Sequence, residues 1–488
     1  MEDLAWAFME RPLAWRSVTV VAVLLSGVLL ALSPSYGYHR DELYFRVLSE
    51  HPGWGYVDQP PLTPLLAGAG IRLFGDTITG IRVFPALAMA ILVWLVALIA
   101  RELDGSRAAQ TLAAAGTATG AYTLIAGHSL LTLSFDLPLW AAAILFLLKA
   151  LLREQEPRWW LAAGAVIGLA TYNKHLIALL VLGLAAGLLA AGPRRVLASP
   201  WLWAGGLLAL ALAVPNLLYQ VANDWPQLKM AAALSADKGA ELRMMFVPMQ
   251  LTLFGPAVSV IAAFGFVRLW RDRRVRALAV AYPVAAALTL IAGGRFDYTA
   301  GLILLLFAAG CVSAAAAARR VRLAAGVGLA LSGLGSALLA LPLVPVAELA
   351  GTPVPAINEV ARESVGWPEF VAAVQSARAA IPPAEQATAM VFTGSYGEHG
   401  ALARAGVPRV YSAHNHLWLF GPPPDNATTA VLVNVGPQIR GQFGTCERRA
   451  TVDNGAGLDN EEQGLVVWLC RDLRTPWSVT WPRWRHFS

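Results

Sequence analysis

Two short polar motifs, YHRDELYF at residues 38–45 and WGYVDQPP at residues 54–61, decide how this chain is interpreted. They place acids, an arginine, histidines and aromatic rings directly after an apolar run at about residues 15–33. An apolar run of that length is typical of a membrane-spanning helix. Charged and aromatic residues beside such a helix indicate chemistry at the membrane surface.

The chain around these motifs is strongly apolar. Of its 488 residues, 57% are hydrophobic and 14% are charged, whereas soluble domains are about one quarter charged. The excess lies in successive apolar runs, which predict a polytopic α-helical membrane protein with about eleven transmembrane helices. The expected spans are residues 15–33, 82–100, 108–127, 136–152, 159–173, 175–192, 201–220, 245–267, 277–293, 297–317 and 322–342.

The basic residues indicate the orientation. They cluster in alternate loops, which marks those loops as cytoplasmic, so the net charge of +6 is not a sign of nucleic-acid binding. An odd number of spans then places the N-terminus in the cytoplasm and everything after about residue 345 outside. The cytoplasmic set is Arg11, Arg16, Arg101, Arg107, Lys149, Arg153, Arg158, Arg194, Arg195, the run from Arg268 to Arg276, Arg319, Arg320 and Arg322.

Two domains are expected: a transmembrane domain at residues 1–345 and an extracytoplasmic α/β domain at residues 346–488. The second contains helical patterns at 367–380 and 398–405 and strand patterns at 389–393, 407–412, 428–435, 449–452 and 465–470. Cys446 and Cys470 are expected to form a disulfide there, since exported thiols oxidise.

Four acids fall on the external side. Asp41, Glu42 and Asp58 lie in the first external loop, residues 34–81, and Asp136 opens the fourth span. Each has a plainer interpretation: a solvated loop acid for the first three, and for Asp136 a residue that stabilises a helix N-terminus.

Cationic and polar side chains accompany these acids: Arg40, Lys174, His175, Arg295 and Tyr298. Cations at the outer membrane face suit an anion, and a lipid-linked phosphate is the obvious one. The alternative is that each cation extends to the membrane surface or pairs with a nearby acid, as Asp297 would pair with Arg295.

Acids and bases on one face indicate a transfer reaction. A carboxylate removes the proton from an acceptor hydroxyl, and a cationic site stabilises a departing phosphate. The chain has no Walker motif, no GxGxxG after a strand, no HExxH and no GxSxG. This pattern favours an activated sugar carried on a lipid over a nucleotide.

The motifs resemble those of the GT-C type membrane glycosyltransferases, specifically bacterial glycosyltransferase family 39 members with the dolichyl-phosphate-mannose-protein mannosyltransferase-like domain. The lipid A aminoarabinose transferases are relatives of that group. The resemblance covers about residues 30–320. It rests on residues 40–44, 55–62, 135–139, 173–174, 223–226 and 294–298, and weaker likeness extends to residues 396–402 and 414–422.

The resemblance implies a sugar transfer from a polyprenyl-phosphate donor to a protein, lipid or glycan acceptor, with inversion, in the bacterial plasma membrane. Asp41 would be the catalytic acid at the end of the first span, acting either as the general base or to position the acceptor, and Glu42 completes the pair. Asp58 matches a second loop acid and Asp136 a position near the donor sugar. Lys174 and Arg295 match positions expected to hold the lipid phosphate, with Tyr298 nearby.

A divalent metal ion is left open. His39 and the three loop acids offer nitrogen and oxygen ligands, although their spacing matches no recognised metal signature. The histidines of the C-terminal part, His399, His414 and His416, are expected to be surface or turn residues.

Two rival functions remain at this point. A lipid or glycan transporter, such as a flippase, would place polar groups near the bilayer midplane on broken helices, often in two similar halves. A non-catalytic membrane protein that binds glycan would have no need for Asp41, Asp58 and Asp136 together.

Overall fold

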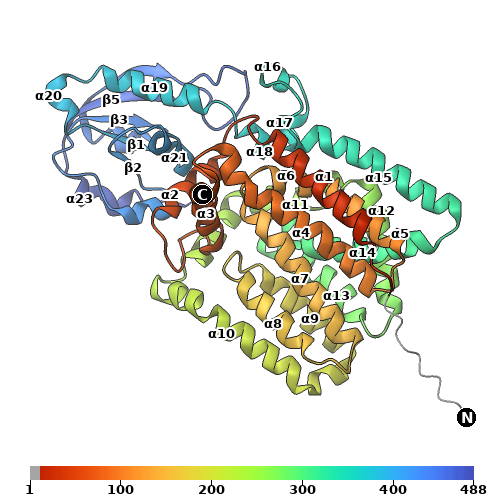
Figure 1. The fold of residues 1–488 in the computed structure, drawn as a ribbon. Helices are drawn as coiled ribbons and strands as arrows, with labels where there is room; N and C mark the ends of the chain where they lie inside the picture. Colours follow the sequence, from red (N-terminus) through yellow and green to blue (C-terminus); the bar gives the residue numbers. More distant parts are fainter. Residues whose placement is uncertain (1–10, 488) are drawn as a thin grey trace, which may run out of the picture.

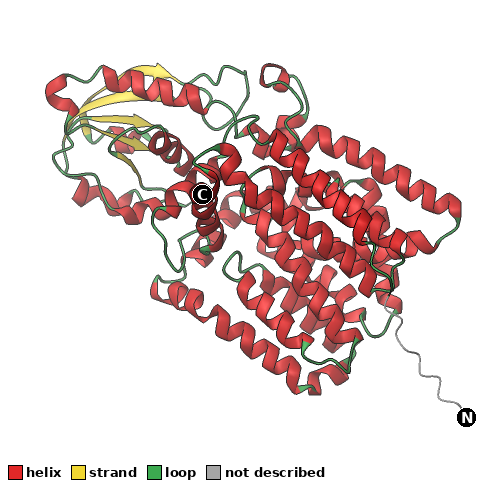
Figure 2. Cartoon of the chain, viewed as in Figure 1, coloured by secondary structure: helices red, strands yellow, loops and turns green. Residues whose placement is uncertain are grey.

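The computed structural model describes residues 11–487, which form a helical bundle with a smaller sheet-containing part at one end (Figures 1 and 2). Residues 1–10, including the expected cytoplasmic N-terminus, lie outside the described range. The bundle consists of α1 (Trp15–Leu32), α4 (Ile78–Glu102), α5 (Arg107–Ala118), α6 (Ala121–His128), α7 (Thr132–Leu152), α8 (Trp159–Ala170), α9 (Ile177–Ala191), η1 (Arg194–Ala198), α10 (Pro200–Ala222), α11 (Pro226–Phe254), α12 (Pro256–Arg271), α13 (Arg276–Ala292), η2 (Phe296–Thr299), α14 (Ala300–Ala316) and α15 (Arg319–Ala340).

The number of membrane-length helices is smaller than expected. Within residues 11–487, six helices are long and apolar enough to cross a membrane, or up to seven if the bent pair α11 and α12 is one span. The remaining expected spans are helical but short: α8, α9 and α13 have 10–17 residues, and the span at 108–127 is divided into α5 and α6. Apolar composition therefore located the helices but overestimated how many run unbroken through a bilayer.

The expected span at residues 245–267 is wrong as a single helix. The chain bends by 103° between α11 and α12. Gly255 takes a φ of +81° at the bend, which residues with a side chain rarely adopt, and Pro256 starts the next helix. A β-carbon at Gly255 would also lie 2.1 Å from the Ser332 hydroxyl, so only glycine fits this break.

Small residues allow the bundle helices to pack closely. Where α12 crosses α14, a β-carbon on Gly265 would lie 1.7 Å from the carbonyl oxygen of Leu306, and one on Gly310 would lie 1.9 Å from that of Ile261. Such backbone contact is the usual way in which apolar helices associate without a hydrophobic driving force between them.

The first external loop contains two helices, α2 (Arg40–Ser49) and α3 (Leu62–Phe74). The sequence before α2 favours a helix start: the His39 ring accepts a hydrogen bond from the Asp41 amide, and the Glu42 carboxylate accepts one from the His39 amide. Acids in the first turn also interact favourably with the helix dipole. Asp41 and Glu42 are therefore held on a helix rather than on a mobile loop.

The C-terminal part has the expected α/β character. Its five-stranded sheet has the order β2-β1-β3-β5-β4, with β1 parallel to β2 and β3, and β5 antiparallel to β3 and β4. The strands are β1 (Met390–Thr393), β2 (Val410–Ser412), β3 (Ala430–Val433), β4 (Phe443–Thr451) and β5 (Val466–Leu473). The helical segments are α16 (Val346–Leu349), α17 (Val354–Ile357), α18 (Glu359–Arg362), α19 (Trp367–Ala379), α20 (Pro383–Gln386), α21 (Tyr396–Arg404), η3 (Asn415–Phe420), α22 (Pro437–Arg440), α23 (Trp477–Thr480) and η4 (Trp481–Arg483).

The disulfide forms between adjacent strands. Cys446 in β4 lies directly opposite Cys470 in β5, with 4.1 Å between their Cα atoms. β4 begins at Phe443, six residues before the strand expected at 449–452, which brings Cys446 into the sheet.

The C-terminal part packs on the first external loop. Leu43 of α2 belongs to the same buried apolar cluster as Trp367 and Leu402, and the Trp367 indole donates to the Tyr38 carbonyl at 2.9 Å. Figure 1 shows α21 beside α2 at this end of the bundle. The loop and the C-terminal part thus lie on the same side of the bundle.

Candidate active site

Asp41 lies at the start of α2 with its carboxylate partly exposed, at 31%. The Tyr396 hydroxyl, on α21, donates a hydrogen bond to its Oδ1 at 2.8 Å. Burial alone would raise the pKa of Asp41, but the positive charge of Arg40 and the hydroxyl of Tyr396 outweigh it, so the pKa lies below its ordinary value. Asp41 is an ionised carboxylate that solvent reaches.

Asp58 is the second acid of this site. The Tyr44 hydroxyl donates to its Oδ1 at 3.1 Å and accepts a hydrogen bond from the His416 amide at 3.2 Å. The rings of Tyr44 and Tyr396 are 4.6 Å apart, so the two tyrosines lie between the two carboxylates. Burial raises the pKa of Asp58 to about 7. The hydrogen bond from the Tyr44 hydroxyl lowers this pKa, but by less than burial raises it.

Glu42 does not share the site with Asp41. Its carboxylate is fully buried and binds both the Nε and NH2 groups of Arg82, at 2.8 and 2.7 Å. The amides of His39 and Leu130 also donate to it, each at 2.8 Å. With four donors occupying its oxygens, Glu42 connects α2, α4 and the start of α7, and its expected catalytic role is not supported by this geometry.

Arg40 faces the C-terminal part. Its guanidinium pairs with Glu359 at 3.1 Å and also with Glu461. These ion pairs join α2 to two glutamates more than 300 residues away in the sequence, and the phosphate-binding role of Arg40 stays a prediction.

Asp136 and Lys174 interact electrostatically at the start of α7 and in the turn after α8. Asp136, on α7, is buried, its Oδ1 has no hydrogen-bond partner, and Lys174 is the cation that acts most strongly on its charge. Lys174 lies in the turn between α8 and α9, and its ammonium lies 5.7 Å from the centre of the Tyr298 ring. Asn173 fixes this turn by donating to the Thr132 carbonyl at 2.9 Å.

Arg295 pairs with Asp297, the alternative that the sequence left open for this cation, with 3.2 Å between Nε and Oδ1. Half of the Arg295 side chain remains exposed, whereas Asp297 is buried. Arg295 also contributes to lowering the pKa of Asp41. Its positive charge therefore acts at the same site as Asp41.

His175 does not join this set of cations. Its Nε2 lies 2.6 Å from the Asn216 side-chain oxygen, and the Asn216 amide donates to the Trp54 carbonyl at 2.7 Å. Burial lowers the pKa of His175, so the ring is neutral at pH 7. The His175 contact attaches the turn before α9 to α10, while Asn216 itself holds the loop at Trp54; the phosphate-binding role of His175 stays a prediction.

The histidines of the C-terminal part were expected at the surface, which is wrong for two of them. His414 is buried, and its Nδ1 accepts a hydrogen bond from the Tyr396 amide at 3.1 Å. His416 accepts one from the Val57 amide at 3.3 Å and packs edge-on against Tyr56. These contacts seat the C-terminal part on the first external loop.

Sequence reasoning missed Tyr44, Tyr396, Arg82 and His416. Tyr44 and Tyr396 lie within motifs that carry the resemblance, but the sequence does not show which residues their hydroxyls contact. Arg82 had a weak signal, as a single charge at the start of an apolar run.

His39 and the loop acids do not converge on a metal site. The His39 Nδ1 accepts a hydrogen bond from the Asp41 amide, and the Glu42 carboxylate forms an ion pair with Arg82. Among residues 11–487, the one group of three metal-type ligands close enough to share an ion is Glu363, Glu461 and Glu462, at a different place.

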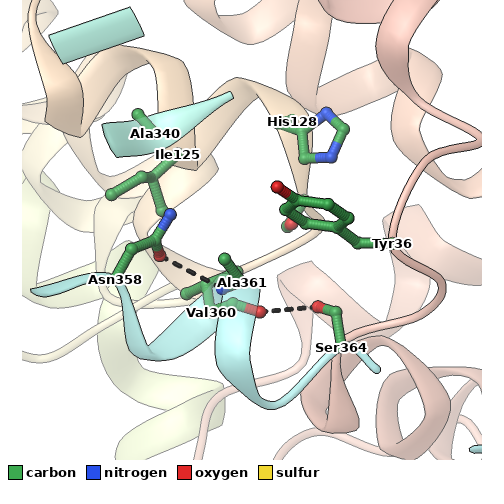
Figure 3. Close-up of a pocket in the computed structure, with 9 residues that line it drawn as sticks. Tyr36, Ile125, His128, Ala340, Asn358, Val360, Ala361 and Ser364 are labelled. Atoms are coloured by element: carbon green, nitrogen blue, oxygen red, sulfur yellow. Dashed lines mark hydrogen bonds between the residues drawn. The ribbon is translucent and has the colours of Figure 1, made fainter. Parts of the chain in front are cut away.

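A small cavity lies between the C-terminal end of α6, the end of α15 and α18. Tyr36 and His128 lie across it from Asn358, with Ser364 at its lower edge (Figure 3). Its volume of about 10 Å³ holds about one water molecule. The cavity is too small for a sugar, so we do not assign substrate binding to it.

Comparison with known proteins agrees with this geometry. The family model described as dolichyl-phosphate-mannose-protein mannosyltransferase matches residues 58–219, and no curated protein sequence matches the chain. The crystal structure of ArnT from Cupriavidus metallidurans in the apo state is 14% identical, with a TM-score of 0.60, over 92% of this chain and 97% of that one.

Two further structures are similar. ArnT from the same organism bound to undecaprenyl phosphate is 16% identical with a TM-score of 0.56, over 92% and 97% of the two chains. The apo oligosaccharyltransferase of Archaeoglobus fulgidus is 15% identical with a TM-score of 0.50, over 81% of this chain and 64% of that one. The chain therefore has the GT-C fold of membrane glycosyltransferases, and its residues 58–219 match the dolichyl-phosphate-mannose-protein mannosyltransferase family.

Proposed function

We propose that this protein transfers a sugar from a polyprenyl-phosphate donor to an acceptor hydroxyl at the extracytoplasmic face of a bacterial plasma membrane, with Asp41 as the base. The observation that carries the proposal is the ionised, partly exposed carboxylate of Asp41, held by Tyr396 within a GT-C fold. The undecaprenyl phosphate bound to ArnT supports the class of donor.

Asp41 is suited to the base role by position and charge. A general base must be deprotonated at the working pH and must reach the proton that it removes. The lowered pKa meets the first condition, and the exposed part of the carboxylate meets the second. Tyr396 holds one oxygen, Oδ1, so Oδ2 is left to face an acceptor hydroxyl.

Lys174 and Arg295 are suited to stabilise the negative charge of the departing phosphate. In the proposed step, the acceptor oxygen forms a bond to the anomeric carbon while the bond from that carbon to the phosphate oxygen breaks. The phosphate leaves with the electron pair, the acceptor proton passes to Asp41, and a single displacement inverts the carbon. Cations positioned where negative charge develops lower the barrier of such a step.

Asp58 and Asp136 have supporting roles in the proposal. Asp58 sets the position of Tyr44 and, through ring contact, that of Tyr396. Asp136 is buried beside the turn that contains Lys174, and its Oδ1 has no protein partner. In the proposal, this oxygen accepts a hydrogen bond from a hydroxyl of the donor sugar.

The test is transfer by the purified full-length protein from undecaprenyl-phosphate sugars, followed by mass spectrometry of the lipid and of the acceptor fraction. Asp41→Asn should lower transfer by about 10²–10⁴-fold, the usual contribution of a general base. Glu50→Gln, which removes an exposed acid at the other end of α2, is the matched control and should leave transfer unchanged. Undiminished transfer by the Asp41→Asn variant would disprove the assignment of the base.

A further inference from the structure

Three glutamates of the C-terminal part form a cluster separate from the candidate active site. Glu363 follows α18, and Glu461 and Glu462 lie in the segment between β4 and β5. One carboxylate oxygen from each lies within 4.8 Å of the other two. The Ca²⁺–oxygen distance in proteins is about 2.4 Å, so small movements of the side chains would bring the three oxygens onto one ion.

Glu462 is the member that lacks a partner. Its residue is only 2% exposed, and its Oε2 has no hydrogen bond. A buried carboxylate without a partner is costly, since it gives up water without regaining hydrogen bonds or a counter-charge. Burial inside an acidic cluster disfavours the charged form of Glu462 and raises its pKa to about 9, so this carboxyl is compensated either by a proton or by a bound cation.

The neighbouring arginines pair with other carboxylates. Arg362 pairs with Glu363 at 2.7 Å, and Arg40 pairs with both Glu359 and Glu461. A cation among Glu363, Glu461 and Glu462 would give the buried Glu462 carboxylate a counter-charge of its own.

We propose that Glu363, Glu461 and Glu462 bind a hard divalent cation, Ca²⁺ in particular. All three ligands are carboxylate oxygens, and the cluster includes no histidine or cysteine of the kind that favours Zn²⁺. Extracellular calcium sites of this kind are weak, with dissociation constants of about 10⁻⁴–10⁻³ M.

The location gives the ion a structural consequence. Asn460 donates to the Val365 carbonyl at 2.9 Å, and the Glu461 amide donates to Glu363 at 3.2 Å, so this segment already lies against residues 363–365. Arg40, which contacts Glu461, immediately precedes Asp41. A bound cation would therefore stabilise the place where three segments far apart in the chain meet.

The experiment measures calcium binding to the full-length protein in detergent after EDTA treatment and dialysis, by ⁴⁵Ca²⁺ equilibrium dialysis and by Tm. We expect one Ca²⁺ per chain and a Tm that rises with calcium until the site saturates. Glu462→Gln should weaken binding at least tenfold and abolish the rise in Tm. Glu369→Gln, at an exposed glutamate on α19, is the matched control and should bind as the wild type does.

Two measurements keep the result interpretable if Glu462→Gln alters folding. In EDTA, that variant should have a Tm close to that of the wild type, because an amide of the same shape replaces a carboxyl that burial keeps protonated. Glu461→Gln changes a half-exposed residue and should also weaken binding. The proposal is overturned if the wild type shows no saturable binding at about 10 mM Ca²⁺, a concentration tenfold above the weakest expected dissociation constant. Undiminished binding by Glu462→Gln, or binding of Zn²⁺ in place of Ca²⁺, would also overturn it.

Discussion

The hydroxyl of Tyr396 donates a hydrogen bond to Asp41 at 2.8 Å, although 355 residues separate the two in the chain. The contact places a side chain of the C-terminal part on the acid that the proposed reaction uses. The C-terminal part is thereby a component of the site, rather than an accessory beside it.

Tyr396→Phe tests this contact. Because the hydroxyl helps to lower the pKa of Asp41, its removal should raise that pKa. A base acts only when deprotonated, so activity falls as pH decreases through its pKa, and the acid limb of the kcat/KM profile should move to higher pH. Tyr411→Phe, at a tyrosine of β2 without a side-chain contact to Asp41, is the control. An unchanged acid limb would show that Tyr396 acts through packing alone.

Asp58 predicts how stability depends on pH. Its pKa rises from 3.8 to about 7 on folding, so between these values the folded chain holds a proton that the unfolded chain releases. Stability should fall as pH increases through this window, by at most about 4 kcal/mol for a shift of about three units. Tm measured between pH 5 and 8 should decline less in Asp58→Asn than in the wild type. Parallel Tm curves would contradict the burial of an uncompensated carboxyl.

The buried pair of Glu42 and Arg82 predicts a large loss of stability. Arg82→Met leaves Glu42 without its counter-charge in the protein interior, which costs about 3–5 kcal/mol. The double variant Glu42→Gln with Arg82→Met removes both charges and should recover much of that loss. Thermal unfolding in detergent and the yield of monodisperse protein are the measurements. A double variant as unstable as the single one would show that hydrogen bonding, rather than charge, dominates at this place.

Lys174 and Arg295 predict the affinity for lipid phosphate. Lys174→Met and Arg295→Gln should each weaken binding of undecaprenyl phosphate about tenfold, or about 1.4 kcal/mol, since each removes one cation. Lys229→Met is the control, because Lys229 is an exposed lysine that pairs with Asp224. Equal affinities in all three variants would place the phosphate elsewhere.

The disulfide predicts a redox effect on stability. Cys446 and Cys470 are 24 residues apart, and closing a loop of that size stabilises a protein by about 3 kcal/mol. Reduction of the wild type should lower the Tm of the C-terminal part, and the double variant Cys446→Ser with Cys470→Ser should match the reduced protein. A reducing agent without effect on the Tm of the wild type would contradict this.

Local patterns predicted most of the elements. Apolar runs located the bundle helices because hydrophobic length is a property of consecutive residues, and turn residues bounding short apolar runs located the five strands. The same patterns failed at Gly255, where one backbone angle divides an apolar run, and at Phe443, where β4 begins in polar sequence that pairs only because β5 lies beside it.

The sequence by itself determined that this is a polytopic helical membrane protein, that acids gather after its first helix, and that cations follow in later turns. Composition and short motifs contain that information, and the GT-C fold was what the resemblance of those motifs implied. The tertiary structure alone decided the partner of each polar group: Arg82 for Glu42, Glu359 and Glu461 for Arg40, and Tyr396 for Asp41. The physical reason is that a buried charge is satisfied by whatever donor the packing brings within about 3 Å, and residues hundreds of positions apart reach that distance only once α21 has packed on α2.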